Sequence, residues 1–112
     1  MHVAGGEWEH QLMSHLEGCH LILLLISPDY IASDYLYHVE MTRAMERHAK
    51  GQARVLPILL HPVHWQGEPF GKLPVLPENL RPVSQWRKQR LAFLRVSLGI
   101  RDVIQQIQSD FL

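Results

Sequence analysis

Six consecutive apolar residues, Leu21–Ile26, constrain the fold of this chain more than any other feature. Side chains alternate between the two faces of a strand, so a run without alternation is typical of a strand buried on both faces. Such strands occur in parallel sheets that helices cover on both sides. The run therefore predicts an α/β fold. It also directs attention to the residues after Ile26, because ligands of open parallel sheets bind beyond the carboxyl ends of the strands.

The overall composition is that of one small globular domain over residues 1–112, with 46% hydrophobic residues. The 11 Lys and Arg residues balance 11 Asp and Glu residues, which gives no support for nucleic acid or an anionic membrane as a partner. No apolar run is long enough to span a bilayer, and the N-terminus lacks the pattern of a secretory signal. The single cysteine, Cys19, excludes an internal disulfide and favours a cytoplasmic location.

Helical periodicity, with apolar residues three or four positions apart, occurs in three segments. They are 7–17, with Trp8, Leu12 and Leu16; Ser33 or Asp34 to about Lys50, with Tyr37, Met41, Ala44, Met45 and His48; and Arg87 to the C-terminus, with Phe93, Val96, Ile100, Val103, Ile107 and Phe111. We expect Gly51 to end the second helix. Gly99 interrupts the third, and close packing against a neighbour would explain a glycine there.

A second buried strand is predicted at Arg54–Leu60, although Pro57 removes one donor from its ladder. Between the strand at 21–26 and the next helix, Ser27-Pro28 predicts a short capped turn. The segment 61–87 is rich in Pro, Gly and Trp, with a possible short strand near Leu73–Leu76, and is either functional or a packed excursion. Alternation of helices and strands predicts parallel strands with right-handed crossovers.

A series of short motifs extends over nearly the whole chain in a fixed order. It comprises Gly6-Glu7-Trp8-Glu9, Ile26-Ser27-Pro28-Asp29-Tyr30, Ser33-Asp34-Tyr35 with Glu40, Ala44-Met45-Glu46-Arg47-His48, Val55-Leu56-Pro57-Ile58-Leu59, His64-Trp65, Pro69-Phe70-Gly71-Lys72-Leu73, Leu76-Pro77, Pro82-Val83, Trp86, Ala92-Phe93-Leu94 and Gly99-Ile100-Arg101. In this order the motifs resemble the bacterial type of Toll/interleukin-receptor (TIR) domain.

The resemblance implies a flavodoxin-like parallel sheet with helices on both faces. It also implies a domain truncated at the N-terminus, because the family's first two strands have no counterpart before Met1. In the complete family sheet the strand equivalent to 21–26 has a neighbour on each side. We therefore expect one edge of this strand to be bare, and a bare hydrophobic edge promotes self-association or aggregation.

Enzymatic members of the TIR family cleave NAD at the nicotinamide–ribose bond, with one glutamate on the helix equivalent to 33–50. By position this glutamate is Glu40. A carboxylate there can stabilise the oxocarbenium-like ribose that forms as nicotinamide leaves. The resemblance also implies that Ser33 and Tyr35 lie near the substrate. The chain departs from the commoner family pattern, since Tyr35 replaces a tryptophan and Leu36 stands where a cysteine is usual.

Each of these residues has a structural alternative. Glu40 can be a surface carboxylate that pairs with Arg43 at i+3, an interaction of about 0.2–0.5 kcal/mol. Ser33 can cap the helix, since serine is a preferred N-cap residue. Tyr35 and Tyr37 can stack on nicotinamide or adenine, but aromatic residues at helical spacing are more often part of a core, and Tyr37 lies on the apolar stripe.

A metal site is not expected. His61 and His64 have i, i+3 spacing, but no Cys, Asp or Glu cluster at ligand spacing accompanies them. Gly5-Gly6 is too short to form a phosphate-binding loop. The sequence thus predicts no bound cofactor, with NAD as a substrate.

Three functional hypotheses follow. The first is a TIR signalling or defence module derived from an NAD glycohydrolase. The second is a non-catalytic module that assembles with other TIR domains through the helix at 33–50 and the segment 61–87. The third, an unrelated flavodoxin-like domain, is disfavoured because no acidic cluster or phosphate loop follows a strand.

Overall fold

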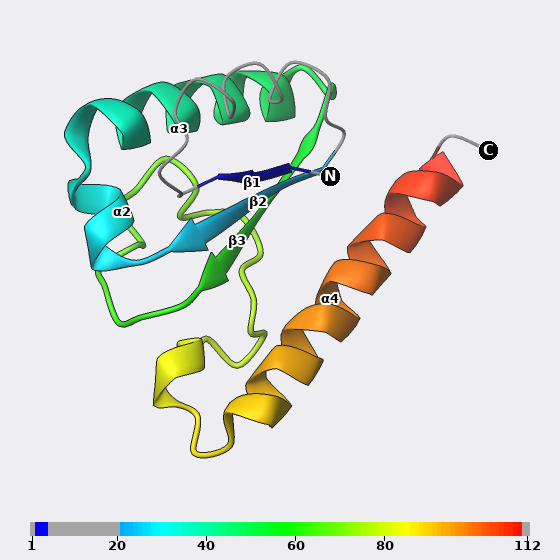
Figure 1. Cartoon of the computed structure of the whole chain (residues 1–112). Coiled ribbons are helices and arrows are strands. Elements are labelled where there is room, and N and C mark those ends of the chain that lie inside the picture. Colours follow the sequence, from blue (N-terminus) through cyan, green and yellow to red (C-terminus); the bar gives the residue numbers. More distant parts are fainter. Residues whose placement is uncertain (1, 5–20, 111–112) are drawn as a thin grey trace.

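The computed structural model describes residues 2–4 and 21–110, which form a parallel sheet between two layers of helix (Figure 1). The predicted helix at 7–17 and Cys19 lie outside the described residues. The elements are β1 (His2–Ala4), β2 (Leu21–Ile26), α2 (Pro28–Ala32), α3 (Asp34–Ala49), β3 (Arg54–Leu59), the 3-10 helix η1 (Val83–Gln85) and α4 (Gln89–Asp110). Within these residues, no helix is long and apolar enough to cross a membrane.

The sheet has the order β1-β2-β3, and all neighbours are parallel. β2 pairs along its whole length with β3, from Leu21 opposite Arg54 to Ile26 opposite Leu59. On its other side, β1 pairs with Ile22–Leu24. The α/β prediction is therefore confirmed, whereas the expectation of a bare edge on β2 is wrong over these three residues. The three residues of β1 are too few to show a strand pattern, so the sequence did not predict this neighbour.

Beyond β3, a single bridge joins Ile58 to Leu76, in the region where a short strand was expected. The Leu76 amide donates to the Pro57 carbonyl (2.9 Å), and the Leu59 amide donates to the Leu76 carbonyl (2.7 Å). The N and O atoms of one strand residue point to the same side. The missing donor of Pro57 therefore faces this bridge, and the ladder between β2 and β3 is not interrupted there.

Alternate residues of β2 and β3 supply two separate cores, one on each face of the sheet. Ile22, Leu24 and Ile26 pack with Met41 and Ala44 of α3. On the opposite face, the core consists of Leu21, Leu23, Leu56, Ile58, Leu76, Val83, Ala92 and Val96, so α4 covers that side. Burial on both faces explains the unbroken apolar run, and removal of one such side chain typically destabilises a domain by about 2–5 kcal/mol.

α3 follows β2 as predicted, and the segment predicted as a short capped turn between them is the five-residue helix α2. The Ser27 side chain accepts a hydrogen bond from the Tyr30 amide (3.2 Å), and Pro28 occupies the first turn, which confirms the predicted cap. α3 ends at Ala49, and Gly51 follows with φ of +71°. This left-handed backbone favours glycine, as expected for a residue that ends a helix.

The segment 61–82 is a packed excursion rather than an open loop. Phe70 is fully buried, and both Phe70 and Val75 belong to the core under α3. The segment thus returns the chain over the sheet before η1 and α4, and Phe70 fixes it there.

α4 lies across the second face of the sheet, and its glycine has the packing role that the sequence indicated (Figure 1). A Cβ atom at Gly99 would lie 2.7 Å from each methyl group of Leu76. Ala92 and Val96 are buried as part of the inward face. Phe93, predicted to belong to the same stripe, is 58% exposed, because it lies at the margin of the contact with the sheet.

Candidate functional site

Glu40 lies on the inward face of α3 and has no exposed surface. Its neighbours on that face, Met41 and Ala44, are core residues. The surface-carboxylate alternative is therefore wrong. Arg43, the suggested i+3 partner, lies on the exposed side of the helix and approaches Glu46 at 3.9 Å.

Tyr30, in the middle of α2, brings a second polar group to Glu40. Its ring is 3% exposed and belongs to the core beneath α3. Burial raises the pKa of the Tyr30 hydroxyl, and the negative charge of the nearby Glu40 carboxylate raises that pKa further. A tyrosine hydroxyl and a carboxylate thus share one apolar site between α2, α3 and β2.

Tyr37 extends this arrangement toward the segment 61–82. Its ring meets that of Tyr30 edge to face, with centroids 5.1 Å apart and an interplanar angle of 89°. Its hydroxyl donates a hydrogen bond to the Glu68 carboxylate. Burial and this hydrogen bond raise the pKa of the Tyr37 hydroxyl. We call Glu40, Tyr30, Tyr37 and Glu68 the tyrosine cluster, in which two carboxylates flank two aromatic rings.

Ser33 lies beside the tyrosine cluster, but it does not cap α3 through its side chain. Its hydroxyl donates to the Tyr30 carbonyl, and its amide also donates to that oxygen (3.1 Å). Ser33 therefore closes the C-terminal end of α2. It fixes the backbone of the residue that carries the buried hydroxyl.

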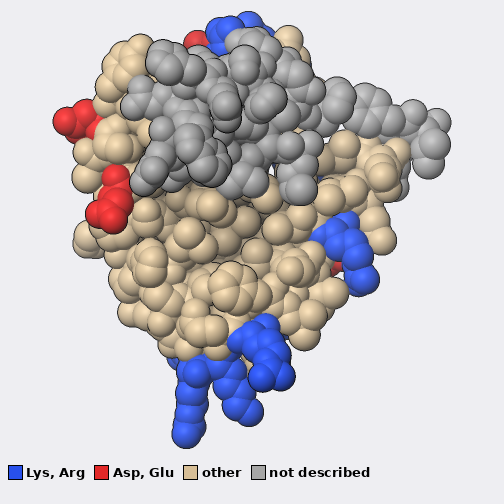
Figure 2. Space-filling view, viewed as in Figure 1, with Lys and Arg blue, Asp and Glu red and all other residues tan. Residues whose placement is uncertain are grey.

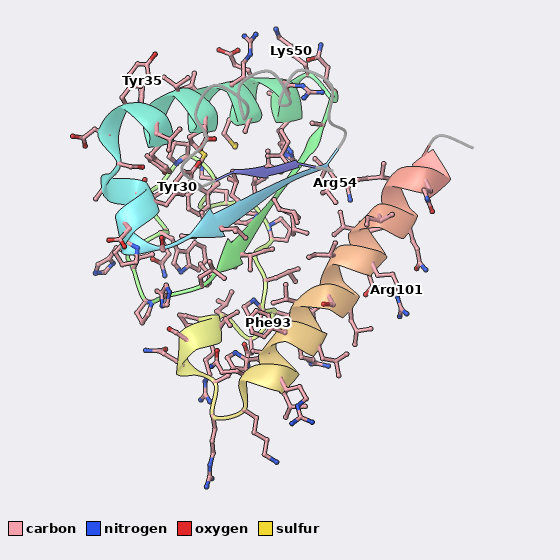
Figure 3. All side chains as sticks on the ribbon, viewed as in Figure 1. Tyr30, Tyr35, Lys50, Arg54, Phe93 and Arg101 are labelled. Atoms are coloured by element: carbon pink, nitrogen blue, oxygen red, sulfur yellow. The ribbon has the colours of Figure 1, made fainter. Side chains whose placement is uncertain are left out.

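Tyr35 is 74% exposed and extends from the outer side of α3, whereas Tyr30 lies inside, between α2 and the sheet (Figure 3). Positions 35 and 40 are five residues apart, which separates them by roughly 140° around a helix. The structure therefore brings Ser33 and Glu40 close to the same tyrosine, and it places Tyr35 on the opposite side.

Tyr30 is the site residue that the sequence did not single out. It belongs to a five-residue helix that was interpreted as a turn. A signal was present: an aromatic hydroxyl four residues after the end of a doubly buried strand occupies the place where α/β sheets bind ligands.

Arg47 is a further polar residue on the buried side of α3, at 7% exposure. Its Nη2 atom donates to the Gln52 carbonyl (3.3 Å), and its own carbonyl accepts from the amides of Gln52 and Ala53. Arg47 thus secures the turn into β3. His48 has a similar role, since its Nδ1 atom accepts from the Val55 amide (3.2 Å).

No group of three or more His, Cys, Asp or Glu side chains that could hold a metal forms among residues 2–4 and 21–110. His61 and His64 are both exposed. A cavity of about 580 Å³ lies on the other face of the sheet, between the strands and α4, with Leu23, Leu25, Ile58, Phe93 and Ile100 among its lining residues. That cavity is apolar and separate from the tyrosine cluster, which packs under α3.

Comparison with known proteins agrees with this fold. The family model described as TIR domain matches residues 2–95. An uncharacterized protein from Sinorhizobium fredii, y4lF, is 42% identical over 104 residues. This alignment covers 93% of the present chain and 32% of the relative, so the chain spans about a third of the length of that protein. No solved structure matches the chain. The chain belongs to the TIR domain family.

Proposed function

We propose that this TIR signalling module cleaves NAD at the nicotinamide–ribose bond, with Glu40 as the essential carboxylate. The observation that supports the proposal is the complete burial of Glu40 beside the Tyr30 hydroxyl. Removal of a carboxylate from water is unfavourable, so folding alone gives little reason for a glutamate at this position. Buried carboxylates with a specific polar partner are typical of functional sites.

The reaction requires one anion close to the ribose. The C1′–N bond breaks, and its electron pair leaves with the ring nitrogen, so that nicotinamide departs as a neutral molecule. The ribose becomes an oxocarbenium-like cation, which the Glu40 carboxylate stabilises. A water oxygen then bonds to C1′ and loses one proton. The products are ADP-ribose, nicotinamide and a proton, and no general acid is needed.

The remaining residues have positioning roles in this proposal. Tyr30 places a hydroxyl group beside the Glu40 carboxylate, and Ser33 holds the backbone of Tyr30. We propose no contact between Tyr35 and the reacting ribose, because the Tyr35 ring lies on the outer side of α3.

The test is nicotinamide release from NAD by the wild-type chain, by Glu40→Gln and by Glu46→Gln. Glu46 provides a matched control, since it lies on the exposed side of the same helix. We expect the wild type and Glu46→Gln to release nicotinamide at similar rates. Loss of one group that stabilises charge in a transition state typically lowers the rate by about 10²–10³-fold, and we expect such a loss in Glu40→Gln. Equal rates in all three proteins would remove Glu40 from the mechanism.

A second candidate function is a non-catalytic module that assembles with other TIR domains. Its support is the segregation of charge and exposed aromatic side chains on the surface described below. Release of no nicotinamide by any of the three proteins, together with self-association in light scattering, would favour this function.

A further inference from the structure

The balanced net charge of this chain conceals a strong segregation of charge along the sequence. Residues 79–101 contain six of the 11 cations and no Asp or Glu. These cations, all exposed, are Arg81, Arg87, Lys88, Arg90, Arg95 and Arg101. In contrast, residues 21–42 contain Asp29, Asp34 and Glu40 and no Lys or Arg.

The cations gather around the beginning of α4. Figure 2 shows a group of Lys and Arg side chains at the lower end of the molecule, where Figure 1 places the start of α4. The first turn of this helix contains no acidic residue. The N-terminal end of a helix is itself positive, so cations there oppose helix formation. Among the described residues, no carboxylate forms an ion pair with Arg87, Lys88 or Arg90. The stability of α4 therefore does not explain these cations.

Apolar side chains accompany the cations on the outward side of α4. Leu91 is 47% exposed and Leu94 is 53% exposed. Arg90 and Leu91 lie four and three residues before Leu94, so these three side chains share one side of α4, and Arg87 lies two residues before the helix begins. We call these four residues the basic face. An apolar centre bordered by charge is typical of a surface that contacts another protein.

A surface of opposite charge lies around α2 and the start of α3. Asp29 and Asp34 are exposed in the first turns of α2 and α3. Tyr35, next to Asp34, is the most exposed of the large hydrophobic residues that the structure describes. We call Asp29, Asp34 and Tyr35 the acidic face. In Figure 2, Asp and Glu side chains lie at the side of the molecule where α2 and the start of α3 are found.

From these two surfaces we infer that a second copy of this chain docks its basic face against the acidic face of the first. The inference rests on the assembly function proposed above and names its two surfaces. The two faces are complementary in charge, and each carries exposed apolar side chains that the other would cover. A net charge of zero leaves no overall repulsion between the copies.

This contact is heterologous, because the two partners use different surfaces. Each copy that docks leaves one free acidic face and one free basic face, so further copies add in the same orientation. The contact also gives Tyr35 a role that agrees with its outward position, as an aromatic anchor at the interface.

The test uses the full chain and two charge-reversal variants. Arg87→Glu/Arg90→Glu reverses the basic face, and Asp29→Lys/Asp34→Lys reverses the acidic face. Lys50→Glu/Lys72→Glu makes the same change in net charge as the basic-face variant, at exposed positions outside both faces, and serves as the control. Sedimentation velocity measures self-association, and circular dichroism checks that each variant is folded.

We expect the wild type and the control to associate in a concentration-dependent manner, and each reversal variant alone to associate at least about tenfold more weakly. An equimolar mixture of the two reversal variants restores association, because each then meets its opposite charge. An increase from about 50 mM to about 500 mM salt weakens the wild-type association, since the Debye length falls from about 14 Å to about 4 Å.

Two outcomes contradict the inference in different ways. Association of the wild type that both reversal variants retain would overturn these surfaces and leave the assembly function standing. A monomeric wild type at every concentration would contradict the assembly function itself. A parallel measurement uses vesicles of mixed phosphatidylserine and phosphatidylcholine. Binding that only Arg87→Glu/Arg90→Glu abolishes, with self-association unchanged, would identify the basic face as a lipid-binding surface and overturn the inference.

Discussion

At Glu40 the chain keeps a carboxylate among core side chains, next to a tyrosine hydroxyl that is itself buried. The resemblance to TIR domains predicted which glutamate to examine, but not its burial. Periodicity treats glutamate as polar and so leaves it out of the apolar stripe, although Tyr37, Met41 and Ala44 surround its position on the helix. The neighbouring hydroxyl could not be predicted, because it depends on how α2 folds back over the end of β2.

Tyr30 makes stability depend on pH in the alkaline range. Its pKa is raised in the folded protein, mainly by burial and to a smaller extent by the charge of Glu40. A tyrosine in the unfolded chain ionises at about pH 10. Below that pH both states keep the proton and the stability is complete. Above it only the unfolded state loses the proton, so this residue lowers the free energy of unfolding by up to about 1.4 kcal/mol per pH unit.

Tyr30→Phe should therefore make stability less steeply dependent on pH above about pH 10. Urea unfolding at a series of pH values measures the slope. In Tyr30→Phe, the slope of the free energy of unfolding against pH should be smaller by the contribution of one proton. Identical slopes for the wild type and Tyr30→Phe would contradict the burial of this hydroxyl beside Glu40.

At the scale of elements, the sequence predicted β2, β3, α3 and α4 with errors of about two residues, because their patterns are long and regular. It missed β1, which has three residues, and interpreted α2 as a turn. Ser33 illustrates a different difficulty. Serine before a helix usually caps that helix, but here its hydroxyl serves the preceding one. Two closely spaced helices compete for one side chain, and the order of residues alone does not decide between them.

Gly99 gives a prediction for the packing of α4. Alanine at this position would favour the helix by up to about 1 kcal/mol, but its Cβ would overlap the methyl groups of Leu76, and overpacking typically costs about 1–3 kcal/mol. We therefore expect Gly99→Ala to lower the free energy of unfolding.

A double-mutant cycle separates these two effects. In a Leu76→Ala background the obstructing methyl groups are absent, so Gly99→Ala should become stabilising. Thermal or urea unfolding of the four proteins measures the coupling. A destabilising effect of equal size in both backgrounds would show that Leu76 is not the reason for glycine at position 99.

At the scale of the whole molecule, the sheet separates two regions with different properties. The tyrosine cluster lies under α3 on one face, and α4 with its basic face lies on the other. The sequence predicted the layers, because the run Leu21–Ile26 requires cover on both sides. The segregation of charge is present in the order of the residues, but the balanced total of 11 cations and 11 anions does not reveal it, and only the fold shows which of these side chains share a surface.

The central claim is that Glu40 acts on the reacting ribose, and the separate effects of Glu40→Gln on kcat and KM for NAD test it most directly. An interaction made only in the transition state affects kcat and leaves KM nearly unchanged. The account predicts that Glu40→Gln lowers kcat by about 10²-fold or more with KM within about threefold of the wild type. An unchanged kcat, or a change confined to KM, would contradict it.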